Sequence, residues 1–165
     1  MKKLFYSTLL LGLISFIPIQ GFSQEINDAD ALANVKTGKV VWDITIDNPK
    51  KLALFLSVIK ETYDGLIKQN VTPEMIFTFH GGVVKLLSSN REKVPLEEHD
   101  DLDKVHQLLN ELQKKDGVKM ESCSIATRLF GVDNKTILTG IKPVGNTFIS
   151  IIGYNAKGYA VIPIN

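Results

Sequence analysis

The segment Met75-Ile76-Phe77-Thr78-Phe79-His80-Gly81-Gly82 decides the fold class of this 165-residue chain. Its apolar run follows the helix-breaking Pro73 and is too short for an independent helix, so we expect a strand that ends at His80. The two glycines permit a tight turn from this strand into a short helix expected at residues 83–87. A strand that leads directly into a helix is typical of α/β folds.

Upstream, residues 39–47 form another apolar run, which we expect to be a strand with one partly polar face because of Asp43 and Thr45. A fully buried parallel strand is usually an almost continuous apolar run, so these polar side chains are a departure from the pattern. Asn48 and Pro49 then offer a helix N-cap and a first helical position. The apolar residues that follow recur at spacings of three and four and predict a long helix: Leu52, Phe55, Leu56, Ile59, Tyr63 and Leu66.

Downstream, helices and strands continue to alternate. An acidic start and a basic finish predict a helix at about residues 97–115, because such charges complement the helix dipole, and a strand leading to Cys123 follows it. The last third predicts a small helix at about 124–130, a strand at 141–144, a helix at about 147–157 and a strand at 159–162. Five strands alternating with helices predict a parallel sheet covered on both faces.

The first 23 residues have the features of a secretory signal. A positive start at Lys2 and Lys3 precedes an almost wholly apolar run at residues 4–19, and the small residues Gly21 and Ser23 predict cleavage after Ser23. The alternative is a retained membrane anchor, but the apolar run is shorter than the roughly 20 residues needed to cross a bilayer, and a proline interrupts it. We therefore expect export, a periplasmic location and no membrane association after cleavage.

Signal cleavage leaves a polar N-terminal arm at residues 24–38 and a single α/β domain at residues 39–165, which is long enough to bury a substantial core. The whole chain has a formal net charge of +1, and its two leader lysines account for part of its positive charge. Nothing in that balance indicates binding to nucleic acid or to an anionic membrane.

Cys123 is the only cysteine, and it lies where the third expected strand turns into the small helix. Ligands of open parallel sheets are handled at the carboxyl ends of the strands, and a helix amino terminus there favours a thiolate. A lone cysteine in an exported protein cannot form an internal disulfide. Cys123 is therefore a candidate reactive thiol, which must be accessible, or else a small buried hydrophobic residue.

His80 is the second candidate site residue. If its strand neighbours the strand of Cys123, His80 could act near the thiol as an acid/base or hydrogen-bond partner; the alternative is a structural histidine at a strand end. The glycines after it match neither G-x-G-x-x-G nor a P-loop, so we expect no nucleotide or other cofactor. His99, Asp103 and His106 could share a helix face, but such sets are common on charged helices, and we expect no metal site.

Four motifs in order resemble the DsrE/DsrF-like family, which is named for intracellular sulfur-oxidation proteins. They span residues 79–87, 123–126, 140–144 and 158–163, and the resemblance covers residues 40–163. It implies a three-layer α/β/α sandwich with a mainly parallel five-stranded sheet, often assembled into homotrimers or hexamers. It also implies that a cysteine after the third strand carries persulfide sulfur and hands it to another protein, and Cys123 occupies that position.

We therefore predict an exported sulfur carrier, rather than a turnover enzyme, that acts through Cys123 with His80 as a candidate partner. Its expected partners are further copies of itself, in a trimer or hexamer, and a sulfur donor or acceptor protein. The alternative is an oligomeric binding or scaffold module of the same fold without sulfur chemistry. A flavodoxin-like cofactor binder fits less well, because the sequence shows no phosphate-binding loop.

Overall fold

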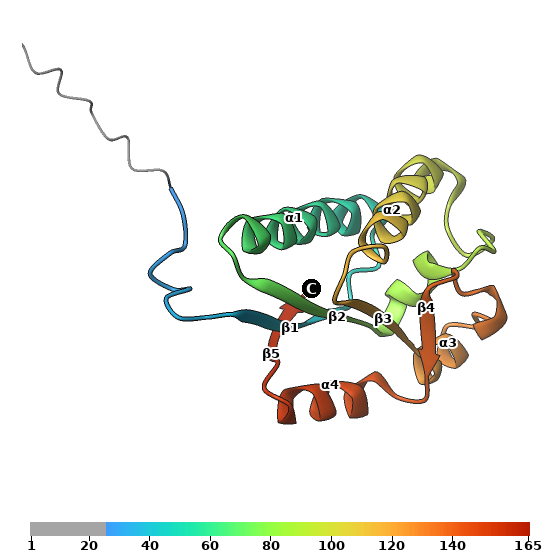
Figure 1. Cartoon of the computed structure of the whole chain (residues 1–165). Coiled ribbons are helices and arrows are strands. Elements are labelled where there is room, and N and C mark those ends of the chain that lie inside the picture. The colour runs from blue at the N-terminus through green and yellow to red at the C-terminus, as the bar shows by residue number, and fades with distance from the viewer. Residues whose placement is uncertain (1–25) are drawn as a thin grey trace, which may run out of the picture.

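The computed structural model describes residues 26–165, so the predicted signal at residues 1–23 lies outside the described residues. Five strands form one sheet in the order β4-β3-β2-β1-β5, and every neighbouring pair is parallel. Helices cover both faces of this sheet (Figure 1). The predicted three-layer α/β/α sandwich is thereby confirmed, with a sheet that is wholly parallel.

The elements alternate along the chain almost as the sequence predicts. The strands are β1 (Thr37–Ile44), β2 (Thr72–Phe79), β3 (Val118–Cys123), β4 (Ile141–Val144) and β5 (Ala160–Ile164). The α-helices are α1 (Pro49–Lys68), α2 (His99–Leu112), α3 (Ser124–Leu129) and α4 (Thr147–Ala156). Short 3-10 helices are η1 (Gly81–Leu87), η2 (Leu96–Glu98) and η3 (Asn134–Thr136).

The boundaries of three strands differ from the sequence-based expectation. β2 begins at Thr72 and not at Met75, so Pro73 lies inside the strand instead of before it. β1 begins two residues inside the predicted arm, because Thr37 pairs with Thr72 at the start of β2. β5 continues to Ile164, beyond the expected end at residue 162, because it stays paired with β1 as far as Ile44. Pro163 is tolerated there because β5 is an edge strand, where a missing backbone N–H disrupts no second ladder.

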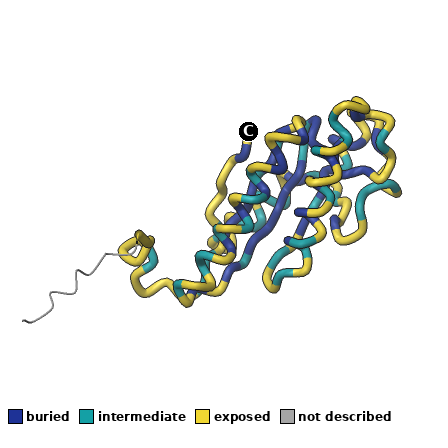
Figure 2. Tube along the Cα trace, turned by 90° about the horizontal axis from the view of Figure 1, so that it is seen from above, coloured by how far each residue is buried: buried dark blue, intermediate teal, exposed yellow. Residues whose placement is uncertain are grey.

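One face of the sheet forms the main hydrophobic core. Alternate strand residues point to opposite faces, and those on this face pack with the buried stripes of α1 and α2. Figure 2 shows that the buried residues follow the central strands, while exposed residues dominate the outer sides of the helices. The strand residues of this core include Val40, Trp42, Ile44, Met75, Phe77, Phe79 and Met120.

The opposite face of the sheet carries polar side chains beside the buried Val41 and Ile76, and α4 lies across it (Figure 1). Along α4 only Thr147 is fully buried, although the helix contains no charged residue. The sheet beneath it presents hydroxyl, imidazole and carboxylate groups on three adjacent strands: Asp43, Glu74, Thr78, His80 and Glu121. These polar groups lie between the sheet and a single helix, where a site for chemistry can be built.

Candidate thiol site

Two helices begin beside the sulfur of Cys123. Cys123 is the last residue of β3 and the N-cap position of α3, so the chain turns directly from strand to helix there. The neighbouring strand β4 leads in the same direction into α4, whose N-cap Asn146 accepts a hydrogen bond from the Phe148 backbone at 3.0 Å. Parallel pairing of β3 and β4 thus brings both helix starts to the same edge of the sheet.

Hydrogen-bond donors from both helix starts surround the sulfur. Burial raises the pKa of the Cys123 thiol, but hydrogen bonds from the Thr147 backbone, the Ala126 backbone, the Thr147 hydroxyl and the Ile125 backbone together outweigh burial and lower that pKa below its ordinary value. The Thr147 hydroxyl is fully buried and has no other hydrogen-bond partner among the described residues.

The accessible thiol expected from the sequence is not found in this conformation, because only 5% of Cys123 is exposed. Its remaining neighbours are apolar and form a small cluster beside the main core: Val84, Ala126, Val132 and Ile137. The first turn of α4, which supplies the donors, is also what covers the sulfur on the polar side. The site is a nearly enclosed thiol with polar groups on one side and hydrocarbon on the other.

His80 occupies the position next to Cys123 on the adjacent strand. Phe79 pairs with Ser122, so the residues that follow them, His80 and Cys123, end neighbouring strands as the sequence analysis required. His80 makes no hydrogen bond to Cys123. Its Nε2 instead lies 2.8 Å from Oδ1 of Asp43 on β1, and its ring meets the ring of Phe148 edge-on at 4.9 Å between centroids.

Asp43 and Thr147 were missed as site residues by the sequence analysis. For Asp43 a signal existed, because it makes one face of the first strand polar where a parallel strand should be apolar on both faces. For Thr147 the sequence places a helix start after the fourth strand, but only the strand order shows that this start lies beside Cys123.

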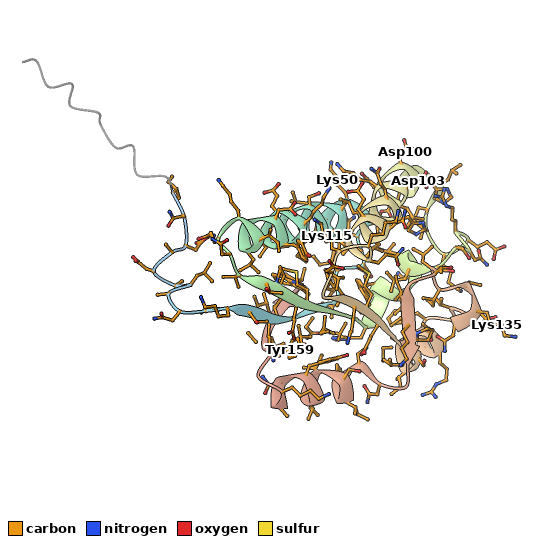
Figure 3. The ribbon with its side chains drawn as sticks, in the orientation of Figure 1. Lys50, Asp100, Asp103, Lys115, Lys135 and Tyr159 are labelled. Atoms are coloured by element: carbon orange, nitrogen blue, oxygen red, sulfur yellow. The ribbon has the colours of Figure 1, made fainter. Side chains whose placement is uncertain are left out.

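Two phenol–carboxylate hydrogen bonds connect the far end of α4 to the sheet. The Tyr154 hydroxyl donates to Glu121 at 3.0 Å, and the Tyr159 hydroxyl donates to Glu74 at 2.6 Å. Tyr159 lies between the sheet and α4 (Figure 3), where burial first and the Glu74 bond second raise its pKa to about 12. These bonds join α4 and the start of β5 to the polar face at some distance from the sulfur.

The two histidines of α2 form hydrogen bonds with backbone carbonyl groups. Nε2 of His99 lies 3.1 Å from the Val94 carbonyl oxygen, and Nε2 of His106 lies 2.9 Å from that of Leu86. Asp103 pairs with Arg91 instead of facing either histidine. Across residues 26–165, no three histidine, cysteine or acidic side chains are grouped so that they could hold a metal ion. In the same range no helix has the length and apolarity needed to cross a bilayer.

A family model described as DsrE/DsrF-like matches residues 39–164, which is most of the chain. The chain belongs to the DsrE/DsrF-like family. This membership indicates a sulfur-related role for the DsrE-like domain.

Two individual proteins are similar to this DsrE-like chain. An uncharacterized protein of Aquifex aeolicus is 25% identical over 125 residues, which cover 76% of this chain and 55% of that protein, so the chain spans about half the length of this relative. The solved structure of MTH1491, a protein of unknown function from Methanobacterium thermoautotrophicum, superposes with a TM-score of 0.58 at 21% identity, covering 76% of this chain and 98% of the other. The structural likeness supports the fold of the domain.

Proposed function

We propose that this DsrE-like protein carries sulfur as a persulfide on Cys123. The observation that supports this function is that the starts of α3 and α4 lie at the edge of the sheet that holds Cys123, and donors there lower the pKa of its thiol despite its burial. The thiolate is the nucleophilic form of cysteine, so a lowered pKa increases the reactive fraction at neutral pH. A cysteine that only filled space in the core would need no such donors.

The loading step is a nucleophilic displacement at sulfur. With thiosulfate as donor, the Cys123 thiolate attacks the outer sulfur, a new S–S bond forms at the cysteine, and the old S–S bond breaks so that sulfite leaves with its electron pair. The product is a cysteine persulfide anion, and no external oxidant or reductant takes part. Unloading is a second displacement of the same kind. An acceptor thiolate attacks the outer sulfur of the persulfide, and the Cys123 thiolate leaves.

Sulfur loading requires the first turn of α4 to move away from Cys123. Because Thr147 is the only fully buried residue of α4, little apolar contact holds this helix on the sheet. Segments with few buried apolar contacts open at low free-energy cost compared with global unfolding. Transient opening at α4 thus gives a small sulfur donor access, and closure returns the donors of Thr147 to the loaded sulfur.

Intact-mass measurement tests the carrier function directly. Purified protein incubated with thiosulfate or sulfide-derived polysulfide should gain whole sulfur atoms, and this gain should disappear in Cys123→Ser and reverse on treatment with a reducing thiol. Ser122→Ala is the matched control, because Ser122 is fully buried beside Cys123 in sequence but points to the opposite face of β3. If wild-type protein gains no sulfur, or if Cys123→Ser gains as much as wild type, the carrier function is wrong.

We further propose that the protein acts outside the cytoplasm and forms a homo-oligomer. The predicted signal supports export to the periplasm. Self-association is supported by an apolar surface on α4 and α3 where Phe148, Ile149, Ile152 and Leu129 are each more than half exposed. A group of exposed large apolar side chains is typical of a protein-interaction surface, and α4 carries no charge that would oppose burial.

Light scattering after size exclusion measures this self-association. Wild-type protein should have a molar mass of three or six chains, and Ile149→Lys combined with Ile152→Lys should reduce it to one chain, because two buried ammonium groups at an interface are too costly to desolvate. Leu54→Lys is the control, since Leu54 is a similarly exposed apolar residue on α1, on the other side of the sheet. A monomeric wild-type protein, or a double variant that still assembles, contradicts the proposed surface.

A further inference from the structure

Asp43, His80 and Cys123 come from three adjacent strands, β1, β2 and β3, and share the face that α4 covers. We infer that Asp43 is a positioning residue that orients His80 to take up and return the proton of the Cys123 thiol. This inference rests on the sulfur-carrier function proposed above and adds to it the acid/base pair that the thiol uses. His80 lies between the other two residues, because β2 lies between β1 and β3.

The contacts of His80 fix its ring and assign different roles to its two nitrogens. Nε2 is occupied by Asp43 Oδ1 at 2.8 Å, and the edge contact with Phe148 restricts the tilt of the ring. The side chains of His80 and Asp43 are only 18% and 23% exposed, so water competes weakly for this bond. Nδ1 makes no hydrogen bond to any residue in the described part of the chain and remains available on the side away from Asp43.

Asp43 is the charged residue that contacts the ring in the described part of the chain. On β3, Glu121 shares the face; its Oε1 accepts a hydrogen bond from Tyr154, and its Oε2 is buried with no partner among the described residues. In η1, Lys85 pairs with Asp47 at 3.6 Å. Helix α4 contributes no charged residue at all. A carboxylate on one imidazole nitrogen holds the ring in a single orientation and directs the other nitrogen to its target, which is the role of the acid in nucleophile–histidine–acid arrangements.

The thiol proton moves to His80 and then to the departing group during sulfur loading. When the thiol ionises, the S–H bond breaks and the proton moves to Nδ1 of His80, which leaves the electron pair on sulfur. The thiolate attacks the sulfur donor, the S–S bond of the donor breaks, and the imidazolium returns its proton to the departing group. Charge and atoms balance without a further reactant.

Alkylation of Cys123 by iodoacetamide as a function of pH tests this role without any sulfur donor. At pH 7 we expect Asp43→Asn and His80→Gln each to slow alkylation by about tenfold, which is less than the roughly 100-fold or more that a positioned acid/base group typically contributes, because the donors at the helix starts already favour the thiolate. At a pH well above the ordinary range of a cysteine thiol, all variants should react at the wild-type rate, because the thiolate then forms without a base. The double variant should be no slower than His80→Gln, since both residues act through one ring.

Asp47→Asn is the matched control, because it removes a nearby carboxylate that pairs with Lys85 and does not contact His80. It should leave the rate at pH 7 within twofold of wild type. The inference is overturned if Asp43→Asn alkylates at the wild-type rate at pH 7, or if its rate is lowered by the same factor at every pH, which is the result of altered access alone. Failure of wild-type protein to take up sulfur would overturn the carrier function while leaving the alkylation profile intact, so the two failures are distinguishable.

Discussion

Thr147→Val should slow the alkylation of Cys123 at pH 7 by about tenfold, because it removes a buried hydroxyl that helps to lower the pKa of the thiol. A hydrogen bond to a charged group contributes about 1.5–3 kcal/mol, which corresponds to a ten- to hundredfold change in the thiolate population. The remaining thiolate is more nucleophilic as its pKa rises, which offsets part of this loss. The backbone donor of Thr147 stays in place, so the loss is partial.

The direction of the pH dependence follows from the lowered pKa of Cys123. The wild-type rate should reach its plateau at a lower pH than the Thr147→Val rate, and the two rates should converge once both thiols are fully ionised. The valine has nearly the same shape as threonine, and the lost hydroxyl has no oxygen or nitrogen partner among the described residues, so the free energy of unfolding should not fall. Reactivity and stability should therefore respond differently to this one substitution.

Ser122→Ala provides the comparison for Thr147→Val. Its hydroxyl is also fully buried and without a partner in the described structure, but it lies on the opposite face of β3 from the sulfur. It should change the alkylation rate by less than a factor of two. Equal effects of the two substitutions, or no effect of Thr147→Val, would show that the α4 donor does not act on the thiol.

Gly117→Ala should reduce the free energy of unfolding by about 3 kcal/mol, a large effect for one methyl group. Gly117 has φ of +77°, and a Cβ there would lie 2.2 Å from the backbone oxygen of Pro73. The Gly117 carbonyl also accepts a hydrogen bond from the Met75 backbone at 2.9 Å, so the clash falls where β2 and β3 begin to pair. Neither backbone segment can move without disturbing the central sheet.

Urea denaturation of Gly158→Ala separates the steric clash from the backbone strain as causes of this loss of stability. Gly158 has a similar φ of +84°, but a Cβ there meets no atom within 4 Å, so its cost is that of backbone strain alone, about 1 kcal/mol. The midpoint of Gly117→Ala should fall well below that of Gly158→Ala at an unchanged dependence on urea. Equal midpoints would mean that β2 adapts to the added methyl group at no cost.

The sequence determines the fold class and most element boundaries, because these depend on local patterns. The apolar run ending at Phe79 forms β2, and the Asn48-Pro49 pair begins α1 as capping chemistry requires. The predicted boundaries are wrong where pairing with a distant strand extends an element, as the pairing of Thr37 with Thr72 extends β1. Such pairing brings together residues far apart in the chain and leaves little local signal.

The sequence also made Cys123 and His80 the candidate site residues, since each is expected at the carboxyl end of a strand in a parallel sheet, but it left open whether the two strands are neighbours. The tertiary structure alone decided what surrounds them. The strand order places Asp43 on the side of His80 that is opposite to Cys123. The chain then passes through β4 into α4, which brings Thr147 beside the sulfur. Hydrophobic periodicity shows which face of an element is buried, but only packing determines which polar groups from other elements share that face.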